Sequence, residues 1–182
     1  MSVLTFLNTT GYIAQFVVNK GDQVVARLPG IKSNASMNVP TDDTYTVTAS
    51  TILDGNTYTS APSVVSGAAC FVARVLQSNV QGTYDFELLQ EASTSADEMV
   101  FQKTTIGPVT FNISKDGVYL QSVVVPDSFR SVSLAIGNTY SMYAVINGVT
   151  TDTVQTTNPN ATITALLDTS DLESGYFTLT AA

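Results

Sequence analysis

The chain of 182 residues combines 44% hydrophobic residues with only 12% charged residues, a balance that excludes an intrinsically disordered protein. Fifteen Asp and Glu against seven Lys and Arg give a net charge of -8, so nucleic-acid backbones and anionic membrane surfaces would be repelled. The sequence has no histidine and a single cysteine, which excludes Ser-His-Asp and Cys-His catalysis, histidine-based metal motifs and an intrachain disulfide.

The first residues of the chain predict a β-strand rather than an export signal. Residues 1–8 lack the basic start and the long apolar run of a signal peptide. The longest apolar run, at 68–73, ends at Arg74 and is too short to span a bilayer. We therefore expect no signal peptide and no membrane span, which leaves a virion, an extracellular assembly and a cytoplasmic inclusion as possible locations.

Apolar and polar residues alternate with a period of two through the first half of the chain, which predicts β-strands and no helix. The predicted strands cover 3–7, 12–18, 23–28, 35–39, 45–51, 57–63, 69–77 and 83–89. Polar turns separate them, and Asp54-Gly55-Asn56 is the clearest hairpin signal. The alternation also places Tyr45 on the apolar face of its strand.

The second half of the chain repeats the first. The stretch 40–49, which contains Thr44-Tyr45, returns ninety-five positions later around Thr139-Tyr140. At the same offset Leu4, Phe6, Phe16, Val18 and Lys20 fall on Met99, Phe101, Phe111, Ile113 and Lys115. The offset then shrinks to ninety-two, where Phe71 and Ala73 match Ile163 and Ala165, as expected of loops that differ in length.

The repeat predicts an all-β protein of two tandem β-sandwich domains related by internal duplication. The first domain covers 1–91, a small polar linker covers 92–98, and the second domain covers 99–182. Each copy runs from an apolar strand through a glycine turn and a proline break to a Thr-Tyr strand, and this order resembles immunoglobulin-like or transthyretin-like modules. The Cys, Trp, Cys trio of immunoglobulin domains is absent, so the strand order stays open.

Two groups of acidic residues suggest chemistry, and for each a structural explanation is favoured. Asp168, Asp171 and Glu173 supply hard oxygen ligands for calcium, although their spacing matches no full calcium loop and also suits a solvated turn. Asp85 and Glu87 share one strand face, as paired acids in glycosidases do, and equally suit an outer face. We expect no cofactor and no catalytic site.

Two further features also have both a functional and a structural explanation. Cys70 lies in an apolar strand without basic neighbours, which favours packing over reactivity. Thr44, Thr46 and Thr48 line one face of a strand, an array able to bind ice or an identical neighbour, although threonine is common in any strand.

Exposed tyrosines are the remaining recognition candidates, because tyrosine is enriched at protein interfaces and in sugar sites. Those least clearly assigned to a core are Tyr12, Tyr58, Tyr119 and Tyr143.

The thin charge and the duplication favour a non-enzymatic structural or assembly subunit, such as a virion decoration, filament or inclusion protein, whose partner is itself or a larger assembly. The alternative is a recognition module, either a carbohydrate-binding protein or a membrane-attacking β-sandwich toxin, in which two sites raise avidity.

Overall fold

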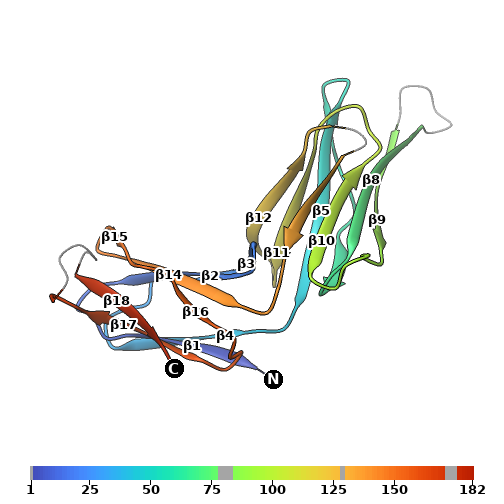
Figure 1. Ribbon diagram of the computed structural model, residues 1–182. Helices are drawn as coiled ribbons and strands as arrows, with labels where there is room; N and C mark the ends of the chain where they lie inside the picture. Colours follow the sequence, from blue (N-terminus) through green and yellow to red (C-terminus); the bar gives the residue numbers. More distant parts are fainter. Residues whose placement is uncertain (1, 78–83, 128–129, 171–175) are drawn as a thin grey trace. The chain divides into compact units, whose positions relative to one another are not determined.

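The computed structural model describes residues 2–77, 84–127, 130–170 and 176–182, and in these ranges every regular element is a β-strand (Figure 1). The expected all-β fold is confirmed. Among the described residues no helix is long and apolar enough to cross a membrane.

The chain divides into two compact units, and unit 1 combines residues 1–42 with residues 138–182. Its first segment forms β1 (Val3–Asn8), β2 (Ala14–Lys20), β3 (Gln23–Arg27) and β4 (Ala35–Pro40). Its second segment forms β14 (Tyr140–Ile146), β15 (Val149–Thr150), β16 (Val154–Thr156), β17 (Thr162–Leu167) and β18 (Phe177–Ala181).

Unit 2 is the continuous segment 43–137. Its first strands are β5 (Thr44–Leu53), β6 (Asn56–Thr59), β7 (Ser63–Ser66), β8 (Cys70–Gln77) and β9 (Tyr84–Glu91). They are followed by β10 (Glu98–Lys103), β11 (Val109–Lys115), β12 (Val118–Val125) and β13 (Ser131–Ala135).

The two units do not follow the predicted division into 1–91 and 99–182. Each unit joins the first half of one sequence copy to the second half of the other, and the predicted linker 92–98 lies inside unit 2. The chain passes between the units at 42–43 and again at 137–138, immediately before the repeated Thr-Tyr stretches. Because the two copies are similar in sequence, the second half of either copy can pack against the first half of the other. The repeat is therefore compatible with the predicted division and with the observed one.

Strand pairing shows the exchange residue by residue. In unit 1, β1 pairs in parallel with β17 and places Phe6 beside Ile163. In unit 2, β10 pairs in parallel with β8 and places Phe101 beside Phe71. The offsets of ninety-five and ninety-two carry the first pair onto the second, so residues that the repeat aligns occupy equivalent positions in the two units. In Figure 1 the blue strand β1 accordingly lies beside the orange-red strand β17.

Each unit contains two sheets that face each other through buried side chains. Unit 1 has sheet A, in the order β18-β17-β1-β4, and sheet B, in the order β15-β14-β2-β3 with β16 also on β14. Unit 2 has sheet D, in the order β13-β10-β8-β9, and sheet C, in the order β12-β11-β5-β6 with β7 also on β5. Ring centroids of Phe6 and Phe16 are 5.0 Å apart between A and B, as are those of Phe101 and Phe111 between D and C.

After each passage of the chain from one unit to the other, the next strand buries its inward side chains in the core of the unit that it enters. Tyr45 and Tyr140 are 2% and 5% exposed, and Val47 and Met142 are fully buried, as the alternation predicts. The predicted strand 57–63 is instead split, because β6 pairs with the second half of β5 while β7 pairs with its first half. The break falls at 60–62, where Pro62 has no amide hydrogen to donate to a ladder.

Candidate functional site

The outward side of sheet C is a broad surface without charge. Tyr45, Val47 and Ala49 point inward on β5, so the residues between them point outward. Strand register places Thr48 opposite Asn112 and Ser50 opposite Thr110, and thereby extends the surface over the neighbouring strands. Its members, named here the C face, are Thr44, Thr46, Thr48, Ser50, Ile52, Thr57, Thr59, Val64, Ser66, Thr110, Asn112, Ser114, Tyr119, Ser122 and Val124. The threonine array noticed in the sequence is the centre of this face.

Sheet A presents a similar surface in unit 1. Its inward positions include the fully buried Leu4, Phe6 and Ile163, so the intervening residues point outward. These residues, named here the A face, are Val3, Thr5, Leu7, Ser36, Asn38, Pro40, Thr162, Thr164, Leu166, Thr178 and Thr180. The described A and C faces contain hydroxyl, amide and apolar side chains and no Asp, Glu, Lys or Arg.

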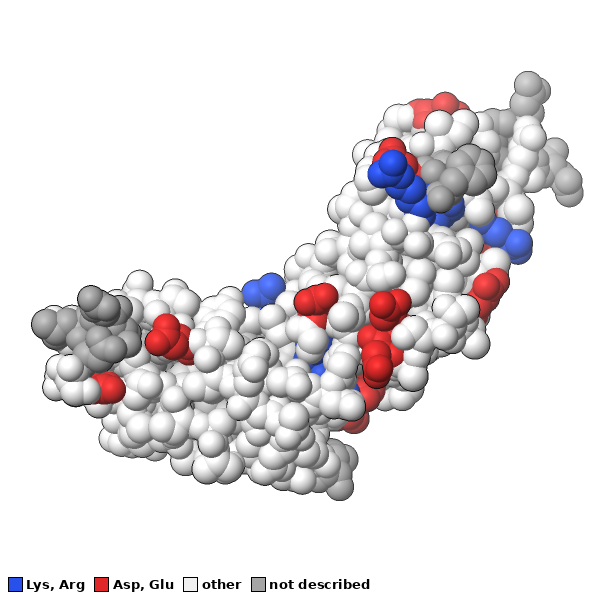
Figure 2. Space-filling model, in the orientation of Figure 1, with Lys and Arg blue, Asp and Glu red and all other residues white. Residues whose placement is uncertain are grey.

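Charges lie elsewhere on the sheets. The outward side of sheet D carries the Arg74–Glu87 ion pair, in which Arg74 Nε donates to Glu87 Oε2 at 2.7 Å. Asp85 lies two residues from Glu87 and opposite Leu76, at an exposed position. Glu87 is thus held by a cation on an outer face, the structural explanation favoured for these two acids. On the side of the molecule visible in Figure 2, charged residues form separate patches in a mostly uncharged surface.

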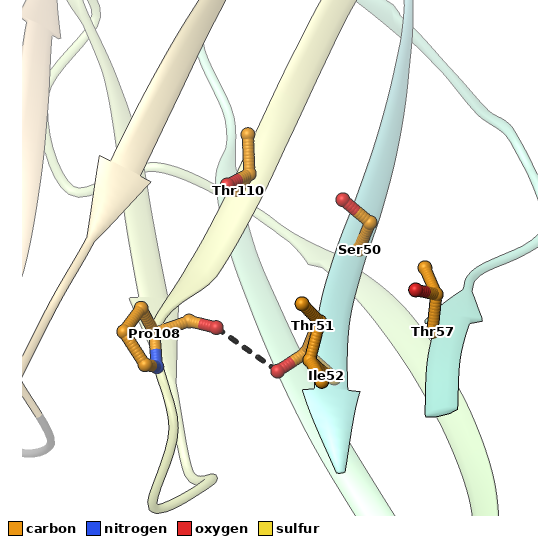
Figure 3. A pocket seen from close by; sticks show the side chains of 6 residues that line it. All are labelled: Ser50, Thr51, Ile52, Thr57, Pro108 and Thr110. Carbon is orange, nitrogen blue, oxygen red and sulfur yellow. Dashed lines mark hydrogen bonds between the residues drawn. The ribbon is translucent and has the colours of Figure 1, made fainter. Parts of the chain in front are cut away.

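An open pocket of about 290 Å3 lies at one end of the C face. Figure 3 shows its lining, drawn from β5, β6 and the start of β11: Ser50, Thr51, Ile52, Thr57, Pro108 and Thr110. Thr51 Oγ1 donates to the Pro108 carbonyl at 2.9 Å and so fixes the start of β11 against β5.

Unit 1 has a pocket at the equivalent place, with a volume of about 500 Å3. Its lining is Gly11, Tyr12, Ile13, Gln15, Val145, Asn147 and Gly148. The ninety-five-residue offset relates Ile13 to Pro108, Gln15 to Thr110 and Asn147 to Ile52. The pocket is therefore duplicated in position but changed in chemistry, since the unit 1 copy holds a tyrosine and two amides.

The four tyrosine candidates are not brought together. Tyr12 is 48% exposed in the unit 1 pocket, and its ring contacts Phe177 at 5.8 Å edge to face. Tyr143 is half-buried on β14, also in unit 1. In unit 2, Tyr119 is 57% exposed on β12, while Tyr58 is half-buried on β6.

Tyr84 of β9 is not among the four recognition tyrosines named from the sequence. Its ring contacts Tyr58 edge to face, with centroids 6.2 Å apart, and its hydroxyl donates to Asp54 Oδ2 at 3.2 Å. The Asp54 carboxylate, which would repel a phenolate, raises the pKa of Tyr84 above its ordinary value. The sequence signal was the acid in the hairpin turn, but its neighbour Tyr84 comes from β9 of sheet D, which the hairpin pattern does not place.

The proposed calcium ligands are only partly described. Asp168 Oδ1 accepts hydrogen bonds from the Ser170 backbone amide at 2.9 Å and from Ser170 Oγ at 2.5 Å. These hydrogen bonds, the side-chain one foremost, lower the pKa of Asp168. Asp171 and Glu173 lie outside the described residues. Within the described ranges no group of three His, Cys, Asp or Glu side chains is placed to hold a metal ion.

Cys70 is half-buried on β8, directly opposite Glu91 of β9. Burial, and secondly the negative charge of Glu91, raises the pKa of the Cys70 thiol. A raised pKa leaves less thiolate at neutral pH, which agrees with a packing role for this residue.

Two buried polar residues hold the loops beside the pockets, and the sequence reasoning missed both. Lys103 is 4% exposed, and its ammonium donates to the carbonyls of Thr105 at 2.9 Å and Gly107 at 2.8 Å. At the equivalent position of unit 1, Asn8 Nδ2 donates to the Tyr12 carbonyl at 2.7 Å. In unit 2 the loop so held displays Ile106, which is 97% exposed and borders pockets of about 480 and 300 Å3.

Comparison of the chain with protein-family models, with curated proteins and with solved structures finds no match. The features of the molecule that point to a function are the two uncharged faces, the duplicated pockets and the loops that border them.

Proposed function

We propose that this protein is a non-enzymatic structural or assembly subunit, of the virion-decoration, filament or inclusion kind, which contacts other protein subunits through its sheet faces. The observation that carries the proposal is the presence of one broad, uncharged outer face in each unit, the A face and the C face. Two uncharged faces on one chain, one in each unit, supply the two contacts that a repeating assembly needs.

The chemistry of the faces suits protein contact. Lys and Glu side chains lose much rotamer freedom and hydration when an interface forms, whereas Thr and Ser lose little. Lys and Glu side chains are normally common on protein surfaces. A chain of net charge -8 also repels its own copies, and contact through uncharged faces keeps the acids of two copies apart.

Light scattering over a concentration series, followed by electron microscopy, tests this proposal. We expect the mean mass to rise with concentration, because the proposal places the uncharged faces of different molecules in contact. The substitutions Thr48→Glu in the C face and Thr164→Glu in the A face should each reduce association by adding unpaired charge to a contact surface. Thr150→Glu is the matched control, since it adds the same charge at an exposed position of sheet B. A protein that stays monomeric at every concentration would contradict the proposal.

We further propose that each unit is a β-sandwich of the immunoglobulin-like or transthyretin-like kind. Two facing sheets and a core of paired phenylalanines support this assignment. A crystal structure of the protein tests it, and sheets that close into a barrel would contradict it.

Carbohydrate recognition is a second candidate, favoured by the unit 1 pocket. Tyr12, Gln15 and Asn147 combine an exposed ring with amide donors and acceptors, a combination suited to neutral sugars. Binding on an array of neutral oligosaccharides should be lost in Tyr12→Ala and kept in Tyr119→Ala. Absence of wild-type binding would remove this candidate.

A further inference from the structure

We propose that the loop 104–108 of unit 2 docks through Ile106 into the unit 1 pocket beside Gly11 of a second copy of this chain. The contact is heterologous, because one molecule supplies the loop and the other supplies the pocket. A pair of molecules therefore still has one loop and one pocket to offer to further copies. This inference rests on the proposed assembly function and adds a contact between loop and pocket to those of the sheet faces.

Ile106 projects from the loop that joins β10 to β11. Its side chain is 97% exposed, and the next most exposed large apolar side chains of the described residues, Ile52 and Val64, are each 66% exposed. Ile106 thus contributes almost nothing to the core of unit 2. Burial against a partner would instead remove nearly the whole side chain from water, which is favourable for an aliphatic group.

The loop holds Ile106 in place before any contact forms. The Lys103 ammonium donates to the carbonyls of Thr105 and Gly107, on either side of Ile106, at 2.9 and 2.8 Å. Thr105 Oγ1 also donates to the Gly107 carbonyl, at 3.0 Å. A loop fixed in this way loses little conformational entropy when it docks, so more of the free energy of burying Ile106 is available to the contact.

The duplicated loop of unit 1 differs at the matching position. The offset of ninety-five relates Ile106 to Gly11, and Gly11 belongs to the lining of the unit 1 pocket. A Cβ atom added at Gly11 would meet no atom within 4 Å outside the two neighbouring residues, so the space beside this glycine is open. One copy of the loop therefore carries a projecting side chain where the other copy leaves space.

The lining of the unit 1 pocket suits an aliphatic side chain. The pocket has a volume of about 500 Å3, compared with about 290 Å3 for the equivalent pocket of unit 2. Ile13, Val145 and Tyr12 belong to its lining, and Tyr12 is 48% exposed. Contact with Ile106 would remove apolar surface of both partners from water.

A second copy is the occupant that the charge favours. The loop 104–108 and the described lining of the pocket contain no Asp, Glu, Lys or Arg. Copies of a chain with net charge -8 repel each other, so they associate most easily through segments that present no acid. Because every copy has both the loop and the pocket, the same contact can repeat from one molecule to the next, in a ring or a filament.

Sedimentation velocity of the full chain over a concentration series tests the inference with two variants. Ile106→Ala removes the docking side chain, and Gly11→Ile places a side chain in the open space of the pocket. Each should raise the dissociation constant about tenfold or more, as expected when a buried anchor residue of an interface is lost.

Leu167→Ala is the matched control for Ile106→Ala and should associate like the wild type. It truncates another exposed apolar side chain, 59% exposed, on β17 of unit 1 and outside the A and C faces. Equal melting temperatures would show that the variants keep their fold.

A mixture of the two variants gives a second, independent readout. Ile106→Ala keeps the pocket and Gly11→Ile keeps the docking side chain, so the mixture can form one complete contact per pair of molecules. At a concentration where each variant alone is monomeric, native mass spectrometry should detect a 1:1 complex and no larger species. A mixture that stays monomeric would contradict a contact between loop and pocket.

The remaining outcomes separate this inference from the assembly function. Wild-type assembly with unchanged association of Ile106→Ala, or of Gly11→Ile, would overturn the docking of this loop into this pocket while leaving the assembly function in place. A wild-type protein that remains monomeric at every concentration would overturn both.

Discussion

Tyr45 and Tyr140 occupy the first inward positions of β5 and β14, directly after the chain passes from one unit to the other. A lysine ammonium lies over each ring: Lys115 Nζ is 4.9 Å from the Tyr45 centroid, and Lys20 Nζ is 5.7 Å from the Tyr140 centroid. Each lysine comes from the sequence copy that did not supply the tyrosine. The repeated Thr-Tyr stretch therefore supplies a buried ring to the core of each unit, directly after the chain passes from one unit to the other.

Truncation of Tyr45 should be costly for this reason. Tyr45→Ala removes a buried ring and should lower the free energy of unfolding by about 3 kcal/mol or more. Lys115→Met removes the cation that lies over the ring, and the loss of this cation–π contact should cost about 0.5–1 kcal/mol. Chemical denaturation monitored by circular dichroism measures both changes. A loss for Tyr45→Ala no greater than that for Lys115→Met would show that the ring does not support the core.

The thiol of Cys70 gives a prediction that depends on pH. Because the negative charge of Glu91 contributes to the raised pKa, Glu91→Gln should lower that pKa and increase the thiolate fraction at a fixed, mildly alkaline pH. Alkylation of the single cysteine by iodoacetamide should then be faster. Asp85→Asn, the same change of charge further along β9, should leave the rate unaltered. A slower reaction in Glu91→Gln would reverse the assigned cause.

At the scale of elements, the loop 104–108 depends on one buried ammonium. Lys103→Met leaves the carbonyls of Thr105 and Gly107 without this donor and should cost about 1–3 kcal/mol in unfolding free energy. Faster hydrogen exchange should be confined to the loop and its borders. A variant as stable as the wild type would show that water replaces the ammonium at no cost.

Period-two alternation predicted most strands of the first copy to within a few residues, because the pattern records which face is buried. It predicted one strand at 57–63 where β6 and β7 form, since the consequence of Pro62 depends on which half of β5 each segment pairs with. The recognition tyrosines were harder to place. Tyr12 and Tyr119 are exposed, whereas Tyr58 and Tyr143 are half-buried, and alternation alone does not show how neighbouring loops cover a ring.

At the scale of the whole molecule, the sequence repeat showed which residues of the two copies are equivalent, but not which copy supplies the neighbouring strand. Phe6 meets Ile163 in the structure, and the same register would set Phe6 beside Phe71 if copy 1 folded on itself. The local chemistry of the two partners is nearly the same, so no local pattern distinguishes them. The uncharged faces were likewise visible only as a threonine array until the pairing of β5 with β11 and of β1 with β17 extended them across sheets.

Thiol cross-linking within the intact chain tests this exchange of halves most directly, because the native Cys70 serves as the reporter. Cys70 lies beside Val100 on the adjacent parallel strand, and neighbouring strands lie about 4.8 Å apart, within the reach of a disulfide. Val100→Cys should therefore form an intrachain bond with Cys70, detected by mass spectrometry after mild oxidation. Thr5→Cys, at the matching position of copy 1 and paired with Thr162, should not. A disulfide between Cys70 and the new cysteine of Thr5→Cys, with no such disulfide in Val100→Cys, would contradict the exchange of halves between the two copies.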